Sequence, residues 1–312
     1  MKKKMFNEIH GEGYLYEHTL ERKTSKKGVD YIGGTLSIAT DNECTNIIKF
    51  EFPYVVPTYA KSGKPNATHK LLDNIINTPT CSIMSGGKEN AIKLRIDSAI
   101  DLNEWYDRNS GELISNMRNS GGFVNNTQKL NDDENKRNTF KTDILITAVF
   151  RKEPNEETNE PEKAVIKGGI FDFMNNLLPV DFVVYNPKAI DYFENLEPST
   201  SKPVFTTVWG NIVSQEIVKK IETENAFGET LIEERSSSKR EYVINGASTV
   251  PYEWDSEETI TANELKEAMS NREIHLAEIK KNAEEYAKQK EAGTPSVLDV
   301  APAAQKNESF VF

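Results

Sequence analysis

Two strand-like segments that each contain an adjacent glycine pair constrain the fold of this chain more than any other feature. Gly33-Gly34 lies within "YIGGTLSIA" (31–39), and Gly168-Gly169 lies within "AVIKGGIFDFM" (164–174). Around each pair the sequence predicts the same order of elements: strand, polar loop, glycine-pair strand, strand, short helix and further strands. Glycine inside a strand permits a bulge and the close approach of another backbone. The chain is therefore predicted to contain a structural duplication in which each glycine pair bends a sheet.

The order β-β-β-α-β-β favours one fold class over its rivals. It is typical of the OB-fold, a five-stranded, partly open barrel with a helix between the third and fourth strands. In the first half, "NATHKLLDNII" (66–76) supplies that helix, with Asn66 as its N-cap. We predict a mainly β protein with two tandem OB-like five-stranded barrels and a long C-terminal helix. An immunoglobulin-like sandwich and a mixed α+β fold are the alternatives.

Composition shifts along the chain predict its domain boundaries. The charged segment "NDDENKRN" (131–138) separates the two repeats. We expect one barrel over residues 1–130, a second over 139–256, a helix over 257–291 and a flexible tail over 292–312.

The C-terminal helix is predicted from its cap and its apolar stripe. Thr261 and Glu264 form a capping box, and Arg272 interrupts the stripe. The helix is expected to pack on the chain's own barrels, with pairing to a partner chain as the alternative. The stripe consists of Leu265, Met269, Leu276, Ile279, Ala283 and Tyr286.

Net charge is unevenly distributed. The chain carries a formal charge of −11, yet residues 1–70 hold 11 Lys+Arg against 8 Asp+Glu. This asymmetry is typical of a binding face at the front and an acidic, solvating or partner-facing region behind. No apolar run approaches the roughly 20 residues that a membrane-spanning helix needs, and no signal-peptide pattern is present. We expect a cytoplasmic protein without membrane association.

Catalytic and metal-binding motifs are not found in the sequence. The four histidines, at positions 10, 18, 69 and 275, have no metal-ligand spacing, and phosphate-loop and nucleophile-elbow patterns are missing. We therefore predict a protein that is not an enzyme, with no cofactor and no metal.

Cations and aromatic residues of the first repeat predict contact with single-stranded nucleic acid. Such ligands are bound by cations along the phosphates and aromatic faces under the bases. In an OB-fold, the loops between the first two and the last two strands flank the binding groove. Alternation along 31–39 places Tyr31, Gly33, Thr35 and Ser37 on the candidate ligand face. The candidate DNA-binding residues are Tyr14, Tyr16, Arg22, Lys23, Lys26, Lys27, Tyr31, Lys49, Phe52, Lys61, Lys64, Arg95 and Trp105.

Several longer segments carry a resemblance to a known family. They are "GYLYEHTLERKTSKKGVDYIGGTLSIATDNE", "DLNEWYDRNSGEL", "FDFMNNLLPVDFVVYNPKAIDYFENLE" and "PVFTTVWGNIVS". Together they resemble a family of single-stranded DNA-binding proteins with OB-like domains from bacteriophages of Firmicutes hosts, over roughly residues 10–290. The resemblance implies protection of DNA during phage replication or recombination in the host cytoplasm. It also implies replication proteins as partners of the C-terminal helix and tail, although "KNESFVF" holds one acid, Glu308, where such tails carry a cluster.

Two other function classes stay open on the sequence. One is a phage structural or assembly accessory protein, which the negative charge and the heptad-like helix suit equally well. The other is a protein-binding adaptor that presents the acidic second half to a basic partner. A homo-oligomer is compatible with all three.

Overall fold

The computed structural model describes residues 5–59, 61–107, 110–155, 160–224, 230–254 and 259–291, with side chains except within 215–238 and 289–291. The predicted tail, 292–312, lies outside the described residues. The first half contains β1 (Asn7–His18), β2 (Glu21–Thr24), β3 (Asp30–Ala39), β4 (Ile47–Val55), α1 (Ala67–Ile76), α2 (Ile83–Gly86), β5 (Lys93–Tyr106) and β6 (Leu113–Asn126). The second half contains β7 (Asn138–Lys152), β8 (Lys163–Phe171), β9 (Leu177–Val184), α3 (Pro187–Asn195), β10 (Val204–Glu224) and β11 (Thr230–Ala247). A short 3-10 turn, η1 (Glu134–Lys136), joins the halves, and α4 (Ala262–Glu291) follows them.

Strand pairing closes a ring in each half. In the first, β1 pairs with β3 and β5, β3 with β4, and β5 with β6, all antiparallel, and a parallel contact between β4 and β6 completes the ring. In the second, β7, β8, β9, β11 and β10 pair in the same pattern, with β9 and β11 parallel. The helices α1 and α3 occupy the same place in the two orders, so the predicted repetition of elements is confirmed.

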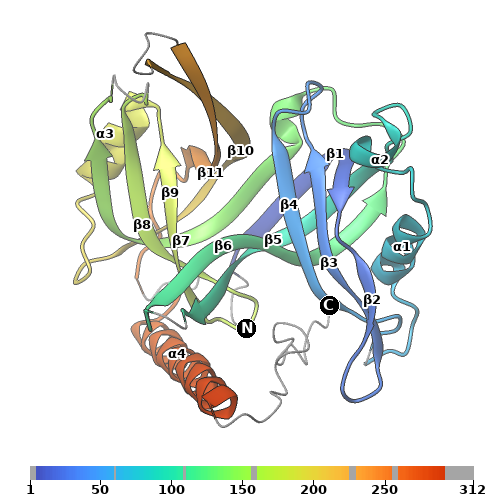
Figure 1. Ribbon diagram of the computed structural model, residues 1–312. Helices are drawn as coiled ribbons and strands as arrows, with labels where there is room; N and C mark the ends of the chain where they lie inside the picture. The colour runs from blue at the N-terminus through green and yellow to red at the C-terminus, as the bar shows by residue number, and fades with distance from the viewer. Residues whose placement is uncertain are drawn as a thin grey trace.

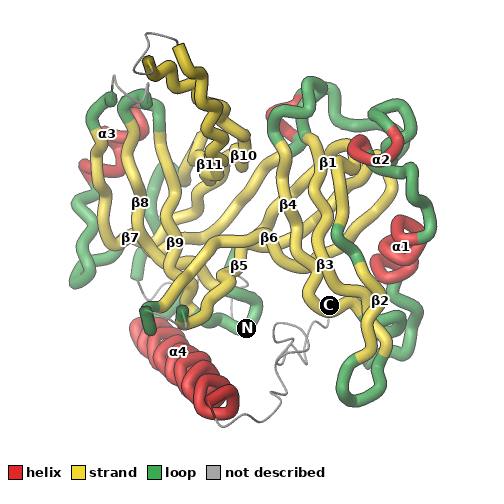
Figure 2. Tube along the Cα trace, viewed as in Figure 1, coloured by secondary structure: helices red, strands yellow, loops and turns green. Residues whose placement is uncertain are grey.

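One pairing joins the rings. β1 runs antiparallel to β7, so the described strands form a single 11-stranded sheet. Figure 1 shows the two rings side by side, and Figure 2 shows that strands dominate both. The strand β2 and the short helix α2 have no counterpart among the described elements of the second half. Arg22 and Lys23 therefore lie in a strand rather than in the predicted loop.

Both glycine pairs lie at β-bulges. The register of β3 against β4 shifts between Ile32 and Gly34, and Gly34 has a φ of +138°. A Cβ atom there would lie 2.3 Å from the carbonyl oxygen of Thr19. In the second ring, Gly168 lies opposite Ile146, where the register of β7 shifts, and its Cβ would lie 2.3 Å from the Leu145 oxygen. The predicted bulge and close backbone approach at each glycine pair are therefore present.

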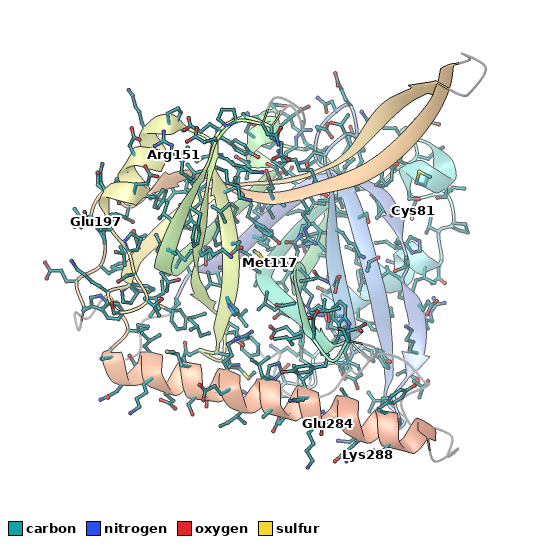
Figure 3. All side chains as sticks on the ribbon, turned by 60° about the vertical axis from the view of Figure 1, so that its left-hand side comes forward. Cys81, Met117, Arg151, Glu197, Glu284 and Lys288 are labelled. Carbon is teal, nitrogen blue, oxygen red and sulfur yellow. The ribbon has the colours of Figure 1, made fainter. Side chains whose placement is uncertain are left out.

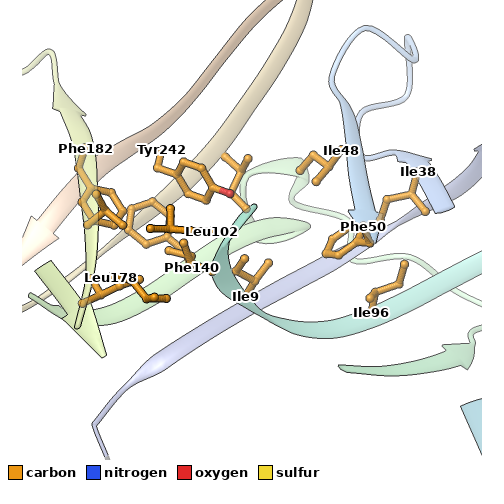
Figure 4. Packing of buried hydrophobic residues seen from close by; sticks show 14 of the residues in the cluster. Ile9, Ile38, Ile48, Phe50, Ile96, Leu102, Phe140, Leu178, Phe182 and Tyr242 are labelled. Carbon is orange, nitrogen blue, oxygen red and sulfur yellow. The ribbon is translucent and has the colours of Figure 1, made fainter. Parts of the chain in front are cut away.

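An aliphatic and aromatic core fills both rings. Phe50 and Ile38 are fully buried in the first ring, and Phe140 stacks on Phe182 in the second with 5.2 Å between ring centroids (Figure 4). The helix α1 covers the first ring with Leu72 and Ile75. Its N-terminus is capped as predicted, because the Asn66 side chain accepts hydrogen bonds from the backbone nitrogens of Thr68 and His69.

The helix α4 packs on the chain's own strands β5 and β9 and runs below both rings (Figure 3). The predicted capping box is present, because the Glu264 nitrogen donates to Thr261 Oγ1 over 3.2 Å and the Thr261 nitrogen donates to Glu264 Oε2 over 3.0 Å. The predicted stripe needs one correction: Ala268 is buried, whereas Met269 is 50% exposed. Among the described residues, no helix combines the length and the apolar character that a membrane crossing requires.

We expect Gly34→Ala to lower the free energy of unfolding by about 3 kcal/mol, because the substitution combines an unfavourable φ with a backbone clash. Urea denaturation measures this loss. Gly28→Ala is the matched control: Gly28 has a φ of +74°, but a Cβ atom added there would have no neighbouring atom within 4 Å, so the loss should be about 1 kcal/mol. Equal losses in the two variants would contradict the importance of close packing at Gly34.

Candidate functional site

A groove of about 1140 Å³ lies between the two rings. One wall is the outer face of β8 and β9, where alternation along each strand presents Lys163, Val165 and Lys167, and then Asp181 and Val183. The facing wall comes from the first ring: Asn103 of β5, residues 115–118 of β6 and Glu51 of β4. The site therefore depends on both halves of the chain.

Cations outnumber acids along this groove. Three acids line it, Glu51, Asp181 and Glu241, against six cations: Arg118, Arg151, Lys152, Lys163, Lys167 and Arg240. The excess of positive charge is local, because the whole chain has a formal charge of −11. A concave surface with this charge attracts an anionic ligand.

Ion pairs fix several of the cations. Arg118 bridges Asp101 (2.7 Å) and Glu51 (3.4 Å) across the first-ring wall. Lys167 pairs with Asp181 over 3.3 Å. These pairs link neighbouring strands and hold the cations at the surface of the groove.

Arg151 is surrounded by carboxylates. It contacts Glu162 (2.6 Å), Glu194 (3.0 Å) and Asp191 (3.4 Å). The hydrogen bond to Glu162 is the main reason that the pKa of Arg151 is raised above its ordinary value. Lys152, by contrast, makes no ion pair within the described part of the chain. The Arg240 guanidinium makes none there either: it donates to the Tyr242 hydroxyl over 3.2 Å and lies 5.9 Å from the centroid of the same ring.

A half-buried charged network lies at the second-ring edge of the groove. Glu241 accepts hydrogen bonds from Lys163 (3.1 Å) and from the Tyr185 hydroxyl, and it pairs with Lys239 (3.2 Å). Burial alone would raise the pKa of Glu241, but these donors outweigh it and hold that pKa below the ordinary value. Burial and the Glu241 carboxylate raise the pKa of Tyr185. This network fixes the edge of β11 against β8 and β9.

Two exposed aromatic side chains accompany the groove. Phe150 lines it with 50% of its surface exposed, and the Lys167 ammonium lies 5.8 Å from the ring centroid. Trp105 is 38% exposed and lies two residues beyond Asn103, on the same face of β5. In single-stranded nucleic-acid sites, bases stack on aromatic faces and neighbouring cations contact the phosphates, and this surface offers both kinds of group. Among the described residues, no group of three or more His, Cys, Asp or Glu side chains could hold a metal ion.

Comparison with known proteins places the chain in a family. A family model described as YorF matches residues 5–282. The chain belongs to the YorF family. A search of curated proteins finds no match. Solved structures similar to this YorF-family chain include the wild-type single-stranded DNA-binding protein from Thermus aquaticus, at 8% identity and a TM-score of 0.43, covering 79% of this chain and 93% of that one. A deletion mutant of the same Thermus aquaticus protein gives 9% identity and a TM-score of 0.43, covering 78% and 94%.

The candidate residues predicted from the sequence fall into separate places. Lys49 is exposed and lies two residues from Glu51 on the outer face of β4, so Lys49 and Trp105 continue the first-ring wall of the groove. On the β1–β5 face, Tyr14 lies under the ammonium groups of Lys88 and Lys93, 5.1 and 5.7 Å from its ring centroid. On the same two strands, Tyr16 is half-buried and Arg95 pairs with Asp97 over 3.4 Å.

A second group of predicted residues lies at one end of the first ring. Arg22 contacts Asp73 of α1 (2.7 Å) and the C-cap residue Asn77 (2.6 Å), so it anchors the end of that helix. Lys23 pairs with Glu21 over 3.2 Å. Lys26 and Lys27 are exposed in the β2–β3 turn, and Lys61 and Lys64 are exposed in the loop after β4. Because Val55 lies opposite Ile32, that loop leaves the ring at the same end as the turn.

Two predicted stacking residues require correction. Phe52 is 1% exposed and belongs to the core. Tyr31 is buried, with its ring 4.5 Å from that of Tyr54. The shift between Ile32 and Gly34 interrupts the two-residue alternation, so Tyr31 does not share an open face with Thr35. Neither ring presents a face to a ligand.

Sequence analysis missed the second-ring wall. The alternation of Lys163, Val165 and Lys167 was a usable signal, because it predicts one face of a strand that carries cations. The acidic composition of the preceding loop concealed it. No feature of the local sequence predicts that the β5–β6 hairpin of the first ring lies opposite β8 and β9.

We expect Glu241→Gln to lower the free energy of unfolding by about 3 kcal/mol at neutral pH. Lys163 would lose its buried carboxylate partner and keep only the exposed Glu160, at 3.7 Å. The folded-state pKa of Glu241 is below its ordinary value of 4.5. Its stabilisation is therefore complete above the unfolded-state pKa and is lost as pH falls through the lower folded-state value. Urea denaturation at neutral and acidic pH should show the difference between the two proteins shrinking in acid. The exposed Glu153→Gln is the control, and a pH-independent difference for Glu241→Gln would contradict this account.

Proposed function

We propose that this YorF-family chain binds single-stranded DNA in the groove between its rings, without catalysis and with little sequence preference. The observation that carries the proposal is Phe150, half exposed among the groove cations. Its ring offers a base a stacking surface, while Lys152 and Arg240 are available for phosphates. Stacking and phosphate contacts are tolerant of base identity, which is why weak sequence preference is expected.

Strand connectivity supports an OB-type barrel as the unit of each ring. Each ring has the pairing 1-2-3-5-4-1 with parallel third and fifth strands, and a helix follows its third strand. OB-folds bind oligonucleotides on the face of their second and third strands. In the second ring these are β8 and β9, which form the groove wall. We propose that the barrels span 1–130 and 139–256, as the sequence predicts.

The first-ring candidates extend this proposed site. Lys49 and Trp105 continue the groove wall. Lys23, Lys26, Lys27, Lys61 and Lys64 offer a further basic surface at the end of the ring, where a longer strand of DNA would leave the groove. Protection of DNA in phage replication or recombination, in the host cytoplasm and with replication proteins at the helix and tail, belongs to the same proposal.

A salt-dependent titration with oligo-dT tests the proposed function. Binding should be tight at low salt, and the logarithm of affinity should fall linearly with the logarithm of salt concentration, by about 0.7 for each phosphate neutralised. Duplex DNA and a mixed-sequence oligonucleotide are the comparison ligands. No binding of oligo-dT at low salt and micromolar protein would overturn the proposal.

We expect the double variant Lys152→Glu/Arg240→Glu to weaken oligo-dT binding about tenfold or more and to reduce the salt slope by about 1.4, because two phosphate contacts are lost. Lys129→Glu/Lys136→Glu is the charge-matched control outside the groove. The triple variant Lys23→Glu/Lys26→Glu/Lys27→Glu measures the end of the first ring separately. Unchanged affinity in the groove variant would move the site away from the groove, and unchanged affinity in the triple variant would confine it there.

We expect Phe150→Ala to cost about 1–3 kcal/mol of binding free energy, since one stacked base would lose its aromatic partner. Phe123, which is 41% exposed and outside the groove, gives the matched control Phe123→Ala. Fluorescence anisotropy of a labelled oligo-dT measures both variants. Equal affinities for the two would rule out stacking on Phe150.

A further inference from the structure

The first-ring wall of the groove is supported from behind by one ion pair. Along β5, Asn103 and Trp105 are exposed, whereas Leu102 and Glu104 face the other side of the strand. The Glu104 side chain is 3% exposed and meets Arg272 of α4, which is 14% exposed. Arg272 Nη2 donates to Oε1 over 2.6 Å and Nη1 donates to Oε2 over 3.1 Å. A two-point pair of this kind fixes both distance and orientation.

The same helix is anchored to the second ring one turn earlier. Ala268 is 3% exposed and packs in a cluster with Leu145, Phe171, Phe205 and Ile260. Leu145, Phe171 and Phe205 belong to β7, β8 and β10, the strands of the second ring. A single helical turn, from 268 to 272, therefore connects a separate apolar cluster on strands of the second ring to the reverse side of the hairpin that forms the facing groove wall.

We propose that the Glu104–Arg272 pair is a clasp that sets the separation of the two groove walls, which makes both side chains positioning residues for ligand binding. The inference rests on the proposed function for its ligand, oligo-dT, but its mechanical part is independent of any ligand. The hairpin β5–β6 extends beyond the β1 pairing, which ends at Ser98, and beyond the β4 contact at Asn119 and Ser120. Strand pairing of its distal part, residues 101–106 with 113–118, is only within the hairpin, and the support comes from Leu102 in the core, from the Arg118–Glu51 ion pair and from α4. Loss of the clasp frees that part to move relative to β8 and β9.

A distance measurement between the walls tests the clasp directly. Spin labels at Asn116→Cys and Lys167→Cys report the width of the groove in the full chain, after replacement of the free cysteines by Cys44→Ser and Cys81→Ala. Arg272→Met removes the charge and keeps the apolar stem, and Arg272→Lys keeps the charge without the two-point geometry. Lys281→Met, at an exposed pair with Glu285 on the same helix, is the control.

We expect a broader label-to-label distance distribution in Arg272→Met, a smaller broadening in Arg272→Lys and none in Lys281→Met. Oligo-dT affinity, measured without the labels, should fall about fivefold in Arg272→Met, with partial recovery in Arg272→Lys. If Arg272→Met does not fold, Arg272→Lys and the conservative Glu104→Gln carry the same comparison.

Two results would overturn the inference. An unchanged distance distribution in the folded Arg272 variants would show that the clasp does not position the wall. A broadened distribution with unchanged oligo-dT affinity would show that the wall does not position the ligand. Failure of the unmodified protein to bind oligo-dT would instead overturn the proposed function, and the distance measurement would still decide the clasp.

Discussion

The antiparallel pairing of β1 with β7 is the constraint on which the rest of the structure depends. It runs from Asn7 opposite Thr142 to Gly11 opposite Asn138 and makes two closed rings into one sheet. Asp143 secures its end: this fully buried carboxylate accepts hydrogen bonds from the Phe6 nitrogen (2.8 Å) and Thr207 Oγ1 (2.5 Å). Backbone pairing of this kind leaves little rotation between the rings. The groove is the space that this fixed arrangement leaves between them.

The groove has an excess of cations although the whole chain has a net negative charge. Most of its cations are held by carboxylates, as Arg151 is by Glu162, Glu194 and Asp191, so the surface is stable without a ligand. A phosphate that approaches such a cation competes with an internal carboxylate, whereas Lys152 and Arg240 have no such competitor among the described residues. The affinity for the proposed ligand, single-stranded DNA, is therefore expected to depend more on these two side chains than on the total number of cations that line the groove.

Local sequence signals predicted the local structure well. The glycine pairs, the Asn66 cap and the Thr261–Glu264 capping box each depend on residues close in the chain, and each is present. Non-local geometry had no such signal. Glu104 and Arg272 are separated by 168 positions, and in the sequence Arg272 only interrupts an apolar stripe. The glycine pair permits the bulge in β3 next to Tyr31. The direction of the Tyr31 side chain, however, depends on the register of β3 against β4, which the sequence around the glycine pair does not reveal.

The duplication therefore has a consequence that neither half could produce alone. The rings share one pairing scheme, but they contribute different parts to the groove: the second supplies the face of its second and third strands, and the first supplies a long hairpin. A buried hydrogen bond crosses between them, since Asn46 of the first half donates to the Ile212 carbonyl of β10 over 3.2 Å. Surface that would be solvent-exposed in a single ring is thus converted into a concave, charged site. A repeated fold that is joined edge to edge thus gains a groove that a single ring does not have.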